Sequence, residues 1–415
     1  MKVLKIMILS ITAIIIFMFL FGIIHNLGIS HKETERIISA NKEKSFDYVE
    51  YISNYKMASA FETFSKASKV ENFEGFIFTK IKKINNEYAV LAYGTDENYL
   101  VFFDEDIEIK RSFLIERGNV RFYDFGYFDK EYIFVGEKNQ KPYYLKTSDT
   151  GSHLSSNSIS SNGRYNVVKA LYEGFIMAGY VIENGVRNAY INKINMFGDR
   201  IWDKRFGRNN NEEIKDIVVT LNEYIFVGTT NSNPTKVTNT LILKYSIDGI
   251  NIFDGVYGTD THNEHITVSF LDEESKLYFA GYVETLDSRN WKSLFVRTVE
   301  DIQNEGIVVS EIRETRGIQN LSRIEDMKYK DGNIYKIGFS VESWPDYDGF
   351  LRISNKNGYV IEQRIYGSNN EERIYSFEFS DDGGIIMVGY QKNENKNIPL
   401  IIKTDNFFRI PEFEK

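Results

Sequence analysis

A short run of aliphatic and aromatic residues that ends in glycine recurs seven times along this chain. Each run is continuous and rich in β-branched and aromatic residues, which is typical of a strand buried on both faces. The spacing of the closing glycines varies from 42 residues (Gly94 to Gly136) to 57 residues (Gly281 to Gly338). This drifting period is close to that of propeller blades. The copies are Ala89–Gly94, Tyr132–Gly136, Phe175–Gly179, Tyr224–Gly228, Tyr278–Gly281, Tyr335–Gly338 and Ile386–Gly389.

A second landmark, an aromatic residue followed by glycine, keeps the repeat in phase. It occurs at Phe206-Gly207, Tyr257-Gly258 and Tyr366-Gly367, each 21 to 23 residues before the glycine that closes the next run. Between the landmarks lie a further apolar strand and an Asx-Gly dipeptide that favours a hairpin turn. The chain is therefore predicted to be all-β, a β-propeller of about seven four-stranded blades over residues 71–415. In the fourth unit the predicted strands are 214–219, 224–230, 240–245 and 250–257.

The recurrent glycine is expected to let neighbouring blades, or the turn that leaves the strand, approach closely, a role that needs no ligand. The ring of blades must also close, because an open propeller would leave an unpaired strand edge. Little chain remains after the third strand of the last unit, which ends near Lys403. We therefore expect either Phe407–Ile410 or Phe73–Phe78 to supply the missing strand of that blade.

The N-terminus carries a hydrophobic segment, Ile6–Ile24, that contains no charged residue and follows Lys2 and Lys5. Its length suits a transmembrane helix, and the preceding lysines place residues 1–5 in the cytoplasm. We expect an uncleaved anchor over 6–24, a partly helical stalk or linker over 25–70, and the propeller on the extracytoplasmic side of the cell membrane. The alternative is a signal peptide cleaved near residue 30, which would release the propeller as a secreted protein.

Composition excludes several classes of function. The net charge of −9 offers no basic surface for phosphates, so no nucleic-acid partner is expected. The chain has no cysteine, which excludes disulfides, thiolate metal sites and a cysteine nucleophile.

The repeat phrases Leu241–Ser246, Asp248-Gly249 and Ile201–Gly207 resemble the propeller repeats of bacterial exported or membrane-anchored proteins, most of which are uncharacterised. The resemblance covers about residues 76 to 410. It implies a propeller outside the cytoplasm and supplies no catalytic residues. The first two units depart most from the pattern, with Asp104 where a basic residue recurs later.

One recurrent feature has chemical interest, because a basic residue closes the third strand of six units. A ring of like charge on one propeller face could concentrate an anionic ligand. The alternative is a packing role in which each base is neutralised by a nearby carboxylate, since repetition often preserves packing. These residues are Lys146, Lys193, Lys244, Arg297, Arg352 and Lys403.

The segment His262–His265 has the composition of a metal site, yet it occupies a slot where other units read Asn210–Glu213 or Asn370–Arg373. A polar loop between blades is therefore expected, with no metal and no other cofactor. No Ser-His-Asp arrangement is readable, so the catalytic residues, if any, stay unknown.

Aromatic residues in loops offer a second candidate surface. Trp344 and Tyr347 lie in an insertion that contains Pro345, where exposure and a binding role are expected. Trp202 is expected to be buried between blades.

These observations lead to two hypotheses about function. The first is a binding or assembly module that presents the propeller surface to a protein or a glycan. The second is an enzyme acting on a carbohydrate or lactone at the central channel, because propellers host both. Carboxylates or histidines with perturbed pKa values at the channel mouth would favour the enzyme.

Overall fold

The computed structural model describes residues 62–63, 73–208, 210–231, 237–258, 262–285, 291–298, 309–312, 321–341, 347–368, 370–393 and 396–410. The anchor predicted over 6–24 and the stalk predicted over 25–70 lie outside these ranges, apart from 62–63. Within these ranges, no helix has both the length and the apolar character needed to cross a membrane.

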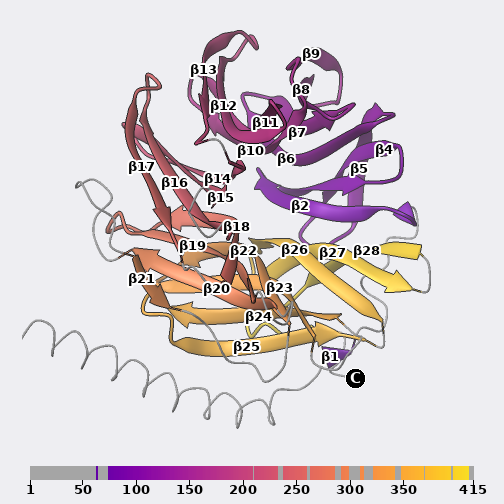
Figure 1. The fold of residues 1–415 in the computed structure, drawn as a ribbon. Coiled ribbons are helices and arrows are strands. Elements are labelled where there is room, and N and C mark those ends of the chain that lie inside the picture. The colour runs from indigo at the N-terminus through magenta and orange to yellow at the C-terminus, as the bar shows by residue number, and fades with distance from the viewer. Residues whose placement is uncertain are drawn as a thin grey trace, which may run out of the picture. The chain divides into compact units, whose positions relative to one another are not determined.

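The described strands form seven separate sheets arranged around a central axis, which confirms the seven-bladed propeller (Figure 1). In each blade the chain runs from an inner strand outwards, and successive inner strands contact one another. The first three blades are β2 (Ile77–Ile84) to β5 (Ile109–Arg117), β6 (Val120–Phe128) to β9 (His153–Ser158), and β10 (Gly163–Leu171) to β13 (Arg200–Phe206). The next three are β14 (Glu212–Val219) to β17 (Asn251–Tyr257), β18 (His262–Leu271) to β21 (Val309–Ile312), and β22 (Ser322–Lys330) to β25 (Val360–Gly367). The last is β26 (Glu371–Phe379), β27 (Ile385–Asn393) and β28 (Lys396–Lys403).

The second and third strands of the complete blades follow the predicted repeat. They are β3 (Glu87–Tyr93) and β4 (Glu97–Phe103), β7 (Glu131–Lys138) and β8 (Lys141–Ser148), β11 (Gly174–Glu183) and β12 (Val186–Asn195), β15 (Glu223–Thr230) and β16 (Asn239–Ser246), β19 (Leu277–Thr285) and β20 (Trp291–Thr298), and β23 (Asn333–Val341) and β24 (Tyr347–Asn355). In the fourth blade the four strands match the predicted ranges to within two residues.

Every inner strand carries a bulge, and the bulge explains the recurrent glycine. Gly136 pairs with Phe122, the residue before the bulge of β6. A Cβ at Gly136 would overlap the carbonyl oxygen of Arg121, and Gly338 meets the carbonyl of Arg323 in the same way. The expectation that the glycine accommodates a neighbouring blade or an exit turn is therefore corrected, because the close approach is made by the inner strand of the same blade.

The first blade lacks this glycine. Ala92, not Gly94, pairs with Phe78, the residue before the bulge of β2. Gly94 therefore lies two residues beyond the position that the repeat occupies in the other blades, and the two runs only look alike in sequence.

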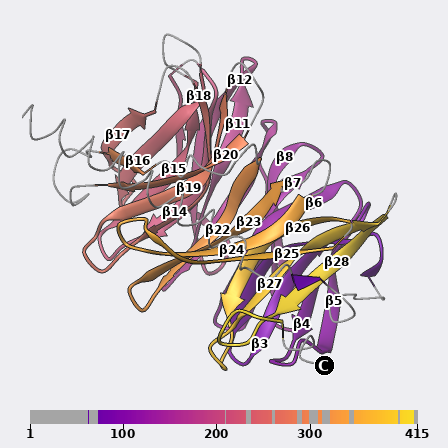
Figure 2. The ribbon, with the colours of Figure 1, turned by 90° about the horizontal axis from the view of Figure 1, so that it is seen from below.

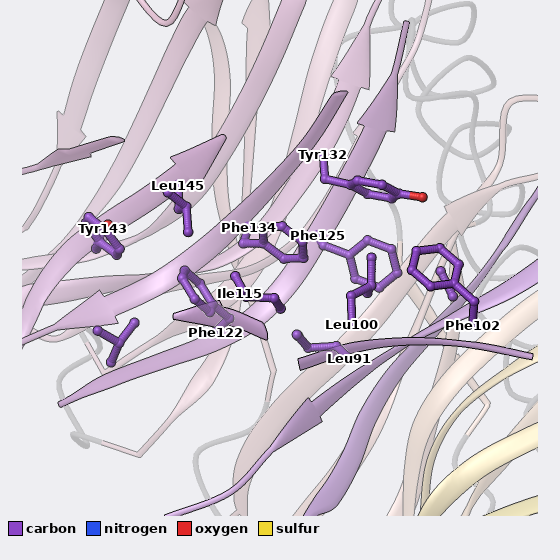
Figure 3. Packing of buried hydrophobic residues seen from close by; sticks show 12 residues of the cluster. Leu91, Leu100, Phe102, Ile115, Phe122, Phe125, Tyr132, Phe134, Tyr143 and Leu145 are labelled. Atoms are coloured by element: carbon purple, nitrogen blue, oxygen red, sulfur yellow. The ribbon is translucent and has the colours of Figure 1, made fainter. Parts of the chain in front are cut away.

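Apolar side chains fill the space between successive blades. Between the first and second blades, Leu91, Leu100 and Phe102 meet Phe122 and Phe134, all nearly inaccessible to solvent (Figure 3). Removing one such side chain from a core typically costs about 2–5 kcal/mol. The blades are therefore held together mainly by apolar packing between their faces.

The ring closes by packing between the first and last blades. Phe78 and Val90 of the first blade share a buried cluster with Ile386 and Ile401 of the last. The Gly75 N–H donates to the Asn397 carbonyl over 2.8 Å. The two terminal blades, β2 to β5 and β26 to β28, lie side by side in both views (Figures 1 and 2).

Neither segment predicted to complete the last blade does so. Among the described residues this blade has three strands, and Phe78 belongs to β2 in the first blade. Residues 404–410 form no strand, because they turn towards the sixth blade, where the Tyr366 hydroxyl donates to the Phe408 carbonyl over 2.8 Å. The short strand β1 (Glu62–Thr63) instead pairs in parallel with β25 at the outer edge of the sixth blade.

Candidate functional site

The basic residues at the ends of the third strands join neighbouring blades. Lys146 is buried, pairs with Glu131 over 2.8 Å and donates to the Met196 carbonyl in the next blade. Lys193 repeats the arrangement, with Glu173 at 2.5 Å and the Ile247 carbonyl at 3.3 Å.

The remaining members of this set follow the pattern to different degrees. Lys403 donates to the Glu105 carbonyl over 2.7 Å and so joins the last blade to the first. Arg297 donates to the Lys356 carbonyl over 3.2 Å, again in the next blade. Lys244 pairs with Glu223 over 2.7 Å. The inclusion of Arg352 in this set is corrected, because the register assigns the position to Ile353. Arg352 donates to Gln363 over 3.0 Å within its own blade. These contacts support the packing role that was the alternative to anion binding.

The first blade makes the same join with a different residue. Phe102 pairs with Ala89 as Lys146 pairs with Ile133, so Phe102 and not Asp104 occupies the basic position. Arg111 from β5 lies over the Phe102 ring at 3.6 Å and donates to the Asp149 carbonyl of the second blade over 2.9 Å.

The predicted aromatic and histidine sites are placed as follows. Trp344 lies outside the described residues. Tyr347 begins β24, half-buried, with the Arg373 guanidinium 4.6 Å from its ring. Trp202 is half-buried, and its indole N–H donates to the Ile247 carbonyl over 3.1 Å. Trp202 is therefore less buried than expected.

His262–His265 lies on the inner strand β18, so its placement in a loop is corrected. The buried Glu264 accepts a hydrogen bond from Thr240 over 3.1 Å, and His265 stacks on Tyr282. Within the described ranges, no three His, Cys, Asp or Glu side chains are grouped closely enough to hold a metal ion.

A second set of residues, which sequence reasoning missed, occupies one equivalent position at the start of each inner strand and is polar in six of the seven blades. In each blade this residue pairs with the residue that follows the blade glycine, as Arg164 pairs with Tyr180. In the first blade, where Ala92 replaces the glycine, it pairs with Tyr93. The inner strands all run in the same direction, so these positions share one end of the axis. We call the set the inner-end ring. Its members are Ile77, Arg121, Arg164, Glu213, His265, Arg323 and Arg373.

Glu213 is the centre of the strongest charge cluster in this ring. Glu213 is only 6% exposed. It accepts from Lys215 over 2.7 Å, from Arg164 and Asn166 over 2.9 Å each, and from Arg187 over 3.3 Å. Burial raises the pKa of Glu213, but Lys215 and Arg164 outweigh it and lower the pKa to about 2. Three cations therefore surround one permanently charged carboxylate.

A hollow of about 410 Å³ opens beside this cluster, between the third, fourth and fifth blades. Burial, together with Arg323 and Lys215, lowers the pKa of His265 to about 4, so its imidazole is neutral at pH 7. Burial also lowers the pKa of Lys215, although the neighbouring Glu213 carboxylate acts to raise it. We call this hollow the pocket. Its lining residues are all polar or charged: Arg187, Asn211, Glu213, Lys215, Thr229, Asn231, Thr238 and His265.

The other side of the ring also holds perturbed groups. Burial raises the pKa of Glu325, against the attraction of Arg323 and Arg373. Burial likewise raises the pKa of Tyr375. Both groups lie beside the ring, within the electrostatic influence of Arg323 and Arg373, and such shifted pKa values are what the enzyme hypothesis predicts near the channel mouth.

Further along the inner strands, aspartates join alternate pairs of blades. Asp124 accepts from the Val168 N–H over 3.0 Å, and Asp216 from the Ser269 N–H over 2.7 Å. Asp326 accepts from the Ser376 hydroxyl over 2.7 Å. These buried carboxylates stabilise the contacts between neighbouring blades and are not available to a ligand.

Comparison with known proteins supports the fold. Neither a family model nor a curated protein matches the sequence. Among solved structures the chain is similar to the polysaccharide lyase Uly1, with a TM-score of 0.50 and 9% identity over 79% of this chain and 90% of that one. It is also similar to the β-propeller domain of Myceliophteria thermophila Cps50 (Swd1), with a TM-score of 0.48 and 10% identity over 80% and 95%. At such identity the similarity concerns the β-propeller fold alone.

Part of the inner-end ring could have been found from sequence. The ring residue precedes the blade glycine by 15 residues in four blades, as Arg121 precedes Gly136, and by 16 residues for His265 and Arg373. Its chemistry changes from blade to blade, so the regular signal is the spacing and not the residue type.

Proposed function

We propose that this chain is a binding module that takes an anionic ligand at the pocket beside Glu213. The observation that supports this proposal is the surplus of positive charge there, because Arg164, Arg187 and Lys215 share one carboxylate. A ligand carboxylate, sulfate or phosphate would neutralise the remaining positive charge, and partly buried cations bind such groups strongly. The amides and hydroxyls of the lining offer further hydrogen bonds.

Calorimetric titration with galacturonate and with galactose tests this proposal, because the two sugars differ in charge and share most hydroxyls. We expect the protein to bind galacturonate and to prefer it over galactose by about tenfold or more. Lys215→Met should abolish the preference. Arg117→Gln is the matched control, since Arg117 is exposed on β5 and pairs with Glu97 away from the pocket. Equal binding of the two sugars, or of neither, contradicts the proposal.

The setting of this module is part of the proposal and rests on the sequence of residues 6–24 alone. We propose that this segment anchors the propeller on the extracytoplasmic side of the cell membrane. Protease added to intact spheroplasts should then digest the propeller and leave a small membrane fragment. Full protection of the propeller would contradict this topology, whereas a soluble form beginning near residue 31 would indicate a cleaved signal.

A second candidate is an enzyme acting on a carbohydrate at the same place. It is favoured by the neutral imidazole of His265, which lines the pocket beside the cationic cluster and can accept a proton. If turnover of a bound glycan is found, His265→Gln should remove the turnover and leave binding within about threefold. Binding without turnover across acidic glycans supports the module.

A further inference from the structure

We propose that the ligand is an acidic polysaccharide chain that lies along the inner-end ring, with one acidic unit in the pocket. This inference rests on the proposed function and goes further, because it extends the site from one blade junction to most of the ring.

The first step is the continuity of the ring on one side of the pocket. The Arg121 guanidinium lies 4.6 Å from the Tyr93 ring and 5.1 Å from that of Tyr123. Arg164 lies 4.8 Å from the same Tyr123 ring and donates to Glu213. Each guanidinium is therefore held against aromatic rings, which reduces the entropy lost when it binds a ligand.

The second step is the same continuity on the other side. His265 stacks on Tyr282 at 4.5 Å, and the Arg323 guanidinium lies 4.3 Å from that ring. Arg323 and Arg373 both lie against Phe339, at 5.8 Å and 5.0 Å. The polar arc thus runs without a break from the second blade to the seventh. It is interrupted only at the first blade, where Ile77 occupies the ring position.

The third step is the distribution of charge along this arc. On the side of the second blade Arg121 lies against the rings of Tyr93 and Tyr123. On the side of the fifth to seventh blades the arginines are paired, Arg323 with Glu325 at 2.5 Å and Arg373 with Glu371 at 2.7 Å. Such pairs present donors and acceptors side by side, which suits sugar hydroxyls that act as both donor and acceptor.

A chain of uniform charge fits this arc less well. An acidic peptide or a single-stranded nucleic acid would bring its anions against Glu325 and Glu371 as well as into the pocket. A peptide would also need apolar pockets for its side chains. A polysaccharide with an acidic unit meets both halves of the arc with matching chemistry.

The test measures how affinity depends on chain length. Oligogalacturonates, alginate oligomers and hyaluronan oligomers of two to eight sugar units are titrated into the protein, with poly-L-glutamate as the comparison for charge alone. For at least one acidic series we expect affinity to rise by about tenfold or more from two units to eight, because the longer chain reaches the paired arginines. Poly-L-glutamate should bind more weakly than the longest member of that series.

Two variants locate the chain on the ring. Arg373→Gln should weaken the longest oligomer by about fivefold and leave the two-unit oligomer unchanged, since only the long chain reaches the seventh blade. Lys215→Met should weaken both lengths, and Arg117→Gln should weaken neither. Thermal unfolding of each variant confirms that it is folded.

The outcomes separate the two proposals. If acidic oligomers bind with an affinity that does not depend on their length, the proposal of a polysaccharide along the ring is wrong, whereas the anion pocket stands. Poly-L-glutamate binding as tightly as the oligosaccharides would overturn the glycan and indicate a site selected by charge. If no acidic oligomer binds, the proposal of a bound polysaccharide fails, and the galacturonate titration decides separately whether the anion pocket stands.

Discussion

Two sets of equivalent positions recur around this propeller, the third-strand set and the inner-end ring, and they behave in opposite ways. The third-strand base recurs at one register position in five blades, and Lys146 and Lys193 are each 3% exposed. Their ammonium groups are committed to a carboxylate and to a carbonyl of the next blade. The inner-end ring varies from blade to blade. Beside it, Arg187 of the pocket is 46% exposed and shares Glu213 with two other cations.

The difference shows how to interpret repetition in a propeller. A residue that every blade needs for packing against its neighbour is repeated, because every junction poses the same problem. A ligand breaks the symmetry, because it contacts only some blades. The irregular positions of a regular repeat are therefore the better candidates for a site.

Removing the end of the last blade should have the largest effect. A chain that ends at residue 398 lacks Leu400, Ile401 and Ile402, each 1–2% exposed, together with the Lys403 contact to the first blade. We expect this chain to lose cooperative unfolding in urea, because its ring cannot close. A chain ending at residue 410 is the control and should unfold cooperatively. Equal midpoints for the two chains would show that the closed seven-blade ring is wrong.

Lys146→Met tests the packing role of the third-strand set directly. We expect a loss of about 2 kcal/mol in the free energy of unfolding, because the Met196 carbonyl loses its charged donor and Glu131 loses its ion-pair partner. Lys110→Met is the matched control, since Lys110 is 53% exposed and should change stability by less than about 0.5 kcal/mol. Equal losses of unfolding free energy in the two variants would show that Lys146 has no special packing role.

His265 should make stability depend on pH in a defined window. The folded pKa of about 4 lies below the ordinary value of 6.5, so on acidification the unfolded chain takes up this proton first. Stability is thus complete above pH 6.5 and falls between pH 6.5 and 4, by at most about 3 kcal/mol. Urea unfolding at several pH values should show a shallower decline for His265→Gln. An unchanged slope would mean that His265 is not desolvated.

Arg187→Ala should separate binding from stability. The side chain is 46% exposed, and Arg164 and Lys215 still neutralise Glu213 without it. We expect galacturonate affinity to fall by about tenfold, with a change in unfolding free energy of less than about 0.5 kcal/mol. Arg205→Ala, on the outer strand β13 with similar exposure, should change neither. A stability loss comparable to that of Lys146→Met would assign Arg187 to packing.

The smallest effect is expected at the exceptional first blade. Arg111→Met should cost about 0.5–1 kcal/mol, because this join to the Asp149 carbonyl is more exposed than its lysine counterparts. Chemical unfolding of Arg111→Met beside Lys146→Met measures the ratio. A larger loss at Arg111 would show that the first junction depends most on its join.

The sequence by itself determined the blades. Strand periodicity, hairpin dipeptides and the glycine spacing are local properties, so the fourth blade was predicted to within two residues. The recurrent glycine could be recognised from sequence, but the reason for it could not. A Cβ at Gly136 would clash with the Arg121 carbonyl because of a bulge in another strand, β6. For the same reason Gly94 was mistaken for its equivalent, although register assigns that position to Ala92.

Only the tertiary structure decided which residues meet. Lys193 and Ile247 are 54 residues apart in sequence, and Arg164 and Glu213 are 49 residues apart, so no local pattern relates them. The packing of neighbouring blades sets both contacts. It buries Lys193 and leaves Arg164 beside the pocket. Burial and partner choice decide whether a charge serves packing or a ligand, and both are properties of neighbouring blades. The sequence therefore contained every residue of the pocket without indicating that they form one.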